Sequence, residues 1–193
     1  FMDFKLKYIT PIEWAEQAAN DIDSFLQDHA DAERKVANMC LSLIAKYPNR
    51  VEIIDELIQI SVEELLHFKQ VYSLIRYRGN ELNGVFQKDP YIKGLMPILR
   101  SDSNLLFMDR LIIASVAELR GSERFKLISE VVDDTKIAKF YRNLHIQELE
   151  HITSFINMAK LYFNDDEVDQ RVEEILVKEA EVTSSLPWRS AIH

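Results

Sequence analysis

The placement of glycine constrains this chain more than any other feature. Only 4 of its 193 residues are Gly and 5 are Pro, and three of the glycines (Gly79, Gly84 and Gly94) fall in one stretch. Outside that stretch, few residues interrupt helices, and apolar residues recur at helical spacing. The pattern predicts an all-α protein. With 47% hydrophobic residues, the chain is long enough for one well-buried core, so we predict a single domain over residues 1–193.

Apolar periodicity and capping residues predict the order of the helices. Asn49 and Glu52 resemble a capping box for the second long helix, whereas Asp133-Asp134 and Asn164-Asp165 suit later helix starts. The predicted segments are a short and a long helix within 11–47 with a break near Asn20, then 51–78, a short helix near 91–99, 103–131, a helix ending near 163, and a final helix to about 182. Two hairpins joined by a crossover over residues 79–102 have the connectivity of ferritin-like bundles. We therefore predict a ferritin-like four-helix bundle with one long crossover and an added C-terminal helix.

The net charge and the cysteine content bear on the partners and the cellular compartment of the protein. The net charge of -9 argues against a general binder of polyanions, because nucleic-acid affinity rests largely on cationic contacts with phosphate. A nucleic-acid partner would need a local basic patch. The single cysteine, Cys40, cannot form an internal disulfide, which favours a reducing compartment such as the cytoplasm. The segment FMDFKLKYIT does not resemble a signal peptide, and no apolar run approaches the roughly 20 residues of a membrane span.

Two Glu-x-x-His motifs carry the strongest chemical signal. They are Glu64-Leu65-Leu66-His67 and Glu148-Leu149-Glu150-His151. On a helix, residues three apart share a face, so each motif can present a carboxylate and an imidazole to one point. Glu33 precedes Glu64 by 31 residues, and Glu118 precedes Glu148 by 30 residues. In each case the two residues are separated by one connection between helices. The repeated unit of Glu, turn and Glu-x-x-His is the ligand arrangement of di-iron and di-manganese carboxylate bundles.

The flanking apolar residues indicate that these side chains point inward, where a carboxylate must be paired or bound to metal. Four carboxylates with two imidazoles suit two iron ions, with manganese also possible, better than structural zinc. Either motif alone would more often lie on a solvated helix face; the joint repeat favours a metal site. The predicted metal ligands, which are also the predicted catalytic residues, are Glu33, Glu64, His67, Glu118, Glu148 and His151.

Other polar and small residues near these motifs are expected to have roles other than binding metal. Glu63, Glu123 and Glu150 are predicted to support the ligands or lie on the surface. Cys40 is predicted to be a core residue. His29, one turn before Glu33, could support the ligands or lie on the polar surface, and we favour the surface. The small residues around Glu118 leave two readings open, a pocket for substrate or oxygen beside the metal, or close helix packing.

The chain resembles a known family, the MiaE-type tRNA hydroxylases, which act on methylthio-isopentenyl-adenosine beside the anticodon. The resemblance covers most of the chain. It is carried by His29-Ala30-Asp31-Ala32-Glu33-Arg34-Lys35, Glu63-Glu64-Leu65-Leu66-His67-Phe68, Arg78-Gly79, Ala117-Glu118-Leu119-Arg120-Gly121-Ser122-Glu123-Arg124-Phe125, Glu148-Leu149-Glu150-His151 and Glu179-Ala180-Glu181.

This resemblance implies a non-haem di-iron monooxygenase that hydroxylates the isopentenyl side chain, with dioxygen as co-substrate. It also implies an external electron donor, a reductase or a ferredoxin, since the chain has no flavin or iron–sulfur motif. The tRNA anticodon loop would meet a local basic surface, and a base could stack on Tyr77 or Tyr91. The candidate cations are Arg76, Arg78, Lys93, Arg100, Arg120 and Arg124.

Two other functions remain open from the sequence. A ferritin-like iron-oxidising or iron-storage protein would use the same ligands but assemble into a cage. A metal-free helical interaction protein would bind no iron and would dock a partner on its acidic face. The sequence also leaves open whether the chain is a monomer or a dimer.

Overall fold

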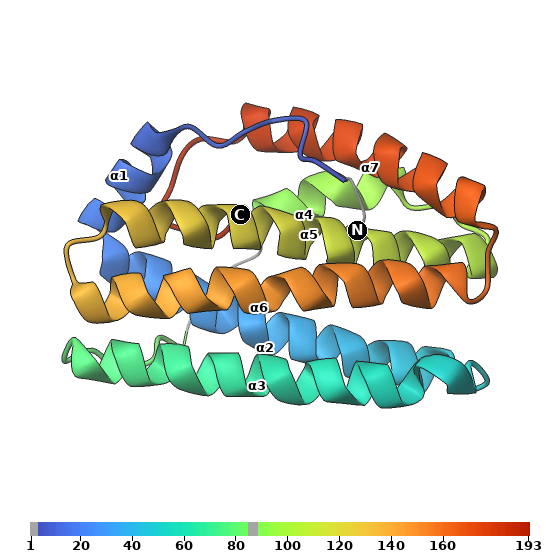
Figure 1. The fold of residues 1–193 in the computed structure, drawn as a ribbon, viewed down its shortest axis with the longest axis horizontal. Helices are drawn as coiled ribbons and strands as arrows, with labels where there is room; N and C mark the ends of the chain where they lie inside the picture. Colours follow the sequence, from blue (N-terminus) through green and yellow to red (C-terminus); the bar gives the residue numbers. More distant parts are fainter. Residues whose placement is uncertain (1–3, 85–88) are drawn as a thin grey trace. The chain divides into compact units, whose positions relative to one another are not determined.

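The computed structural model describes residues 4–84 and 89–193, and all the regular structure in them is helical (Figure 1). The prediction of an all-α chain is confirmed. The elements are α1 (Ile12–Asn20), α2 (Ile22–Lys46), η1 (Val51–Ile53), α3 (Ile54–Tyr77), α4 (Pro90–Leu95), η2 (Met96–Ile98), α5 (Ser103–Val131), α6 (Thr135–Lys160) and α7 (Asp165–Ser185).

Most helix ends follow the sequence signals. The carboxylate of Asp134 accepts hydrogen bonds from the first amides of α6, and the side chain of Asn164 caps α7 in the same way. The predicted capping box at Asn49 and Glu52 is wrong. The chain there forms the 3₁₀ turn η1, and α3 begins only at Ile54 without a side-chain cap. Some amides at this end are instead satisfied by 3₁₀ hydrogen bonds between residues three apart, such as that from the Ile53 amide to the Arg50 carbonyl.

The described residues fall into two compact units. One contains Glu16–Gln87 with Arg189–Ile192, and is called the α2–α3 unit; the other contains the described parts of Phe1–Ala15 and Lys88–Trp188 with His193, and is called the α5–α6 unit. The prediction of a single domain stays a prediction. The predicted crossover includes residues 85–88, which lie outside the described residues.

In the α2–α3 unit, two long helices pack side by side and are joined by a short connection (Figure 1). The Ser61 hydroxyl of α3 donates a hydrogen bond of 3.1 Å to the Ala37 carbonyl of α2. This bond fixes the register of the two helices one turn from Glu33 and Glu64. Gly79 ends α3 with a φ of +79°, a left-handed conformation that favours glycine.

In the α5–α6 unit, α5 packs against both α6 and α7, so residues on most of its circumference are buried. The Ser115 hydroxyl of α5 donates a hydrogen bond of 2.8 Å to the Ile152 carbonyl of α6, the counterpart of the Ser61 bond in the other unit. A salt bridge between Asp109 of α5 and Arg171 of α7 also joins these two helices. In the described part of the chain, no helix is both long and apolar enough to span a bilayer.

Candidate metal centre

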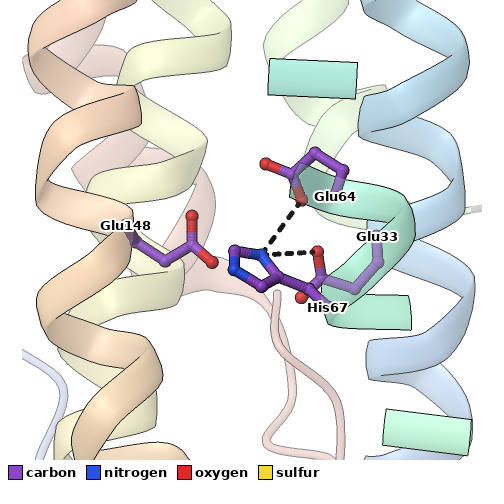
Figure 2. A group of neighbouring side chains, drawn as sticks. All are labelled: Glu33, Glu64, His67 and Glu148. Carbon is purple, nitrogen blue, oxygen red and sulfur yellow. Dashed lines mark ion pairs between the residues drawn. The ribbon is translucent and has the colours of Figure 1, made fainter. Parts of the chain in front are cut away.

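Three of the predicted ligands come together in the α2–α3 unit. Glu33 of α2 and Glu64 and His67 of α3 are all buried, and each offers a ligand atom within 4.8 Å of the others. Figure 2 shows dashed lines from one nitrogen of the His67 ring to the carboxylates of Glu33 and Glu64. The positions follow from helical spacing, since Glu64 and His67 lie one turn apart on the buried face of α3 that also contains Leu57 and Ile60.

The distances in this group suit a metal ion. His67 Nδ1 lies 3.7 Å from Glu33 Oε2 and 3.7 Å from Glu64 Oε2, which is too long for a hydrogen bond. Two ligand atoms that each bind one ion at about 2.1 Å are separated by about this distance when the angle at the ion is near 120°. Two carboxylates so close together in a buried place are costly unless a cation or protons neutralise them. The donor set therefore fits a divalent cation with oxygen and nitrogen ligands.

His29 is a fourth member of this buried group. Its side chain is fully buried, and its Nε2 contacts Glu33 Oε1 within hydrogen-bonding distance. The prediction that His29 is polar surface is therefore wrong. Its position in the sequence could have indicated burial, because His29 lies four residues before Glu33 and next to the apolar stripe of Phe25 and Leu26.

The α5–α6 unit contains the other three predicted ligands. Glu148 and His151 of α6 are buried, and His151 Nδ1 lies 2.9 Å from Glu148 Oε2. Glu118 is buried on α5, which packs against α6. In both motifs the imidazole faces its own glutamate through Nδ1. The side chain of Glu148 is also labelled in Figure 2.

The competing carboxylates have other roles. Glu123 accepts hydrogen bonds from the backbone amide and the hydroxyl of Thr10, and it also pairs with Arg120. Glu63 accepts a hydrogen bond from Gln59 on the solvent side of α3, and Glu150 is exposed. The prediction that these three are not metal ligands agrees with these contacts. Cys40 is buried in the core, as predicted.

The structure divides the predicted cations into buried and exposed ones. Arg120 is fully buried, and Arg124 is buried with its guanidinium 4.4 Å from the centre of the Trp14 ring. Burial, together with the positive charge of Arg120, lowers the pKa of Arg124 to about 10. The prediction that these two arginines belong to a basic surface is therefore wrong. They point inward because α5 is covered by its neighbours, which the local sequence does not reveal.

The predicted stacking residues also differ in exposure. Tyr77 is exposed, whereas Tyr91 is fully buried and stacks on the His193 ring with centroids 4.5 Å apart. Burial and then the negative charge of Glu179 raise the pKa of Tyr91 well above its usual value. Tyr91 is therefore closed to an incoming base. Exposed positions remain for Arg76, Arg78 and Lys93, and Arg100 is half-buried against Asp109.

Buried Glu-x-x-His motifs on long helices define the class of ferritin-like carboxylate proteins. A solved structure supports this class. Protein 43 from Synechococcus, which has aldehyde deformylating oxygenase activity, matches with a TM-score of 0.91 and 26% identity, covering 97% of this chain and 94% of its own. The prediction of a ferritin-like fold is confirmed.

Comparison with protein families is more specific. The family model for tRNA-(ms2io6A)-hydroxylase (MiaE) matches residues 2–193. Two relatives are described as tRNA 2-(methylsulfanyl)-N(6)-isopentenyladenosine(37) hydroxylases. The Pseudomonas putida protein is 31% identical over 176 residues, which is 91% of this chain and 85% of the relative. The Salmonella typhimurium protein is 27% identical over 115 residues, which is 60% of this chain and 42% of the relative.

The chain belongs to the MiaE family of tRNA hydroxylases. Membership makes it an oxidoreductase that acts in tRNA modification. It selects the hydroxylase reading over the iron-storage and metal-free alternatives.

Proposed function

We propose that the six predicted ligands, Glu33, Glu64, His67, Glu118, Glu148 and His151, hold two iron ions, with dioxygen as co-substrate. The observation that carries the proposal is the close group of Glu33, Glu64 and His67, a buried donor set whose spacing suits a divalent ion. The repeat in the sequence supplies the matching set of ligands on α5 and α6. Iron is favoured because oxygen-rich ligation with one imidazole per ion is common in oxygen-using enzymes of this class.

The proposed substrate is the isopentenyl side chain of methylthio-isopentenyl-adenosine in tRNA, as the names of the relatives indicate. In this reaction one oxygen atom enters a C–H bond and the other leaves as water. Two electrons and two protons must therefore be supplied for each hydroxylation. The chain has a single cysteine and so cannot by itself supply the thiolates that hold an iron–sulfur cluster. An external reductase or ferredoxin is the proposed donor, and the cytoplasm is the proposed location.

The chain's own residues contribute binding, orientation and exclusion of water, while the bound iron supplies the activation of dioxygen. The Ser61 and Ser115 bonds fix the helix pairs beside the ligands. Ala117, the small residue before Glu118, is buried in an apolar cluster with Tyr91, Leu95 and Val182, which supports close helix packing there. A site closed to bulk water protects a reactive oxidant from side reactions.

We place the proposed tRNA contact on the α2–α3 unit, near the exposed Arg76 and Arg78. Arg78 pairs with Asp23 of α2. The same unit has a cavity of about 290 Å³ whose lining includes Arg34 and Arg189. Carboxylates line this cavity as well. Several of them are already engaged, since Asp31 pairs with Arg34 and Lys35 and Asp28 accepts the Ile192 amide. These pairings reduce the local repulsion of phosphate.

Charge reversal tests the contact surface. The double variant Arg76→Glu and Arg78→Glu should weaken the binding of tRNA regardless of the RNA sequence. Its affinity should also depend less steeply on salt concentration, because phosphate contacts release counterions. Reversal of both Lys136 and Lys139, which are exposed on α6, changes the total charge by the same amount and serves as the control. Equal binding by wild type and the double variant across salt concentrations would remove Arg76 and Arg78 from the proposal.

The reaction itself is tested by loading the protein with ferrous iron without oxygen. Reductant, oxygen and tRNA that carries the methylthio-isopentenyl adenosine are then added, and the nucleosides are analysed by mass spectrometry. A gain of one oxygen on that nucleoside, lost in Glu118→Ala, is the expected result. Two bound irons with no oxidised nucleoside would reject the proposed substrate while leaving the metal centre.

A further inference from the structure

His29 divides the two oxygens of Glu33 between two imidazoles. Its Nε2 contacts Glu33 Oε1, while Glu33 Oε2 is the oxygen that lies 3.7 Å from His67 Nδ1. One oxygen is thus held by a residue on the same helix, and the other is turned toward the ligand group. The His29 side chain has no exposed surface, so water does not compete for this contact.

We infer that His29 is a positioning residue that fixes the Glu33 carboxylate so that Oε2 is offered to one metal ion. The inference rests on the proposed metal centre and adds a residue to it. A buried hydrogen bond of this kind restricts rotation of the carboxylate and sets which oxygen binds the ion. It also makes a carboxylate in a buried place less costly, since the N–H of His29 donates to it.

The second half of the repeat has no histidine at the position that corresponds to His29. Glu118 occupies the position that corresponds to Glu33, and four residues earlier α5 has Ala114 in place of a histidine. The methyl group of Ala114 cannot donate a hydrogen bond. The contact that His29 makes with Glu33 therefore has no counterpart from the matching position of α5.

A purely structural histidine is the competing explanation, because His29 also packs near the Phe25 ring, with centroids 6.5 Å apart. Two substitutions separate the roles. His29→Met fills similar space without an N–H donor, whereas His29→Gln keeps a donor. His145→Met is the matched control, since His145 is a partly buried histidine of α6 that contacts Ser122.

The experiment titrates ferrous iron into the metal-free full-length variants under anaerobic conditions. Unfolding of the metal-free proteins is followed in parallel, and the absorption spectrum with Co²⁺ reports ligand geometry. We expect His29→Met to weaken the binding of one of the two ions by about 10- to 100-fold, the usual effect of removing a residue that orients a ligand. The cobalt spectrum should change as well, and His29→Gln should restore most of the affinity.

Both ions binding to His29→Met with wild-type affinity would overturn the inference, as would equal losses in His29→Met and His145→Met. A loss in His29→Met that His29→Gln does not relieve would also overturn it in favour of a packing role. Failure of the wild type to bind iron would instead reject the metal centre on which the inference rests. Unfolding of the metal-free variants identifies any loss that comes from misfolding alone.

Discussion

Arg120 and Glu179 form a fully buried ion pair that fastens α7 to α5. Arg120 Nε lies 2.7 Å from Glu179 Oε1, and Nη2 lies 3.0 Å from Oε2. The Thr183 hydroxyl also donates to Glu179, and Arg120 Nη1 donates to the Thr10 hydroxyl. Two parallel bonds between guanidinium and carboxylate give this pair a defined geometry. The pair anchors α7 at a point of α5 only two residues from Glu118.

Removal of one partner of this pair should be strongly destabilising. Glu179→Ala leaves the Arg120 charge buried without its main partner, and we expect the free energy of unfolding to fall by about 3–5 kcal/mol. Glu181→Ala on the same helix is the control. It removes an exposed pair with Lys178, which should cost at most about 1 kcal/mol. Urea unfolding of both variants measures the difference, and similar losses in the two would contradict a special role for the buried pair.

Asp109 should make stability depend on acid pH. Burial acts to raise its pKa, but hydrogen bonds from Arg171 and Arg100 outweigh burial and hold the pKa below its usual value. A carboxyl group with a lowered folded-state pKa stabilises the protein above its unfolded pKa, near 3.9, and this contribution is lost as the pH falls through the folded-state pKa. Wild type should therefore be more stable than Asp109→Asn at pH 7, and the difference should shrink below about pH 4. A difference that stays constant from pH 7 to pH 3 would contradict this account.

Helix limits could be predicted well because each depends on local signals. Helix α5 begins and ends at the predicted residues, Ser103 and Val131. The Glu-x-x-His motifs were also predictable, since spacing alone puts both side chains on one face. These features need no knowledge of what packs against the helix.

Features that depend on distant partners could not be predicted in the same way. Arginine is usually exposed, and the partner that allows Arg120 to be buried, Glu179, lies 59 residues away on another helix. His29 differs only in that its partner Glu33 is local, so the i, i+4 spacing on a buried stripe could have identified it. Tyr91 is covered by the side chain of His193, at the other end of the sequence. Long-range packing thus decides which charged and aromatic residues remain exposed.

Gly94 should resist substitution because of Val182. A Cβ atom at Gly94 would lie 2.6 Å from Val182 Cγ1, in the apolar cluster where α4 packs on α7 and where Tyr91 and Ala117 are also buried. Valine is stiff at χ1 and cannot easily move aside. We expect Gly94→Ala to destabilise the protein by about 1–3 kcal/mol, with partial recovery in a double variant that adds Val182→Ala.

Gly84 supplies the control for this prediction. A Cβ atom there meets nothing within 4 Å, so Gly84→Ala should change the free energy of unfolding by less than about 0.5 kcal/mol. Thermal unfolding of the three variants and the wild type gives the comparison. Equal effects at Gly84 and Gly94 would show that Val182 does not limit the space at Gly94.

Metal binding should reverse the effect of Glu64 on stability. Without metal, Glu64 is a buried carboxylate close to Glu33, so Glu64→Gln removes a source of repulsion and should leave the metal-free protein as stable as wild type or more so. With ferrous iron at 100 times Kd, an intact site gains about 2.7 kcal/mol. Wild type and the matched control Glu63→Gln should show this gain, a chelator should remove it, and Glu64→Gln should lose most of it. A Glu64→Gln variant that iron stabilises as strongly as wild type would show that Glu64 does not bind the ion.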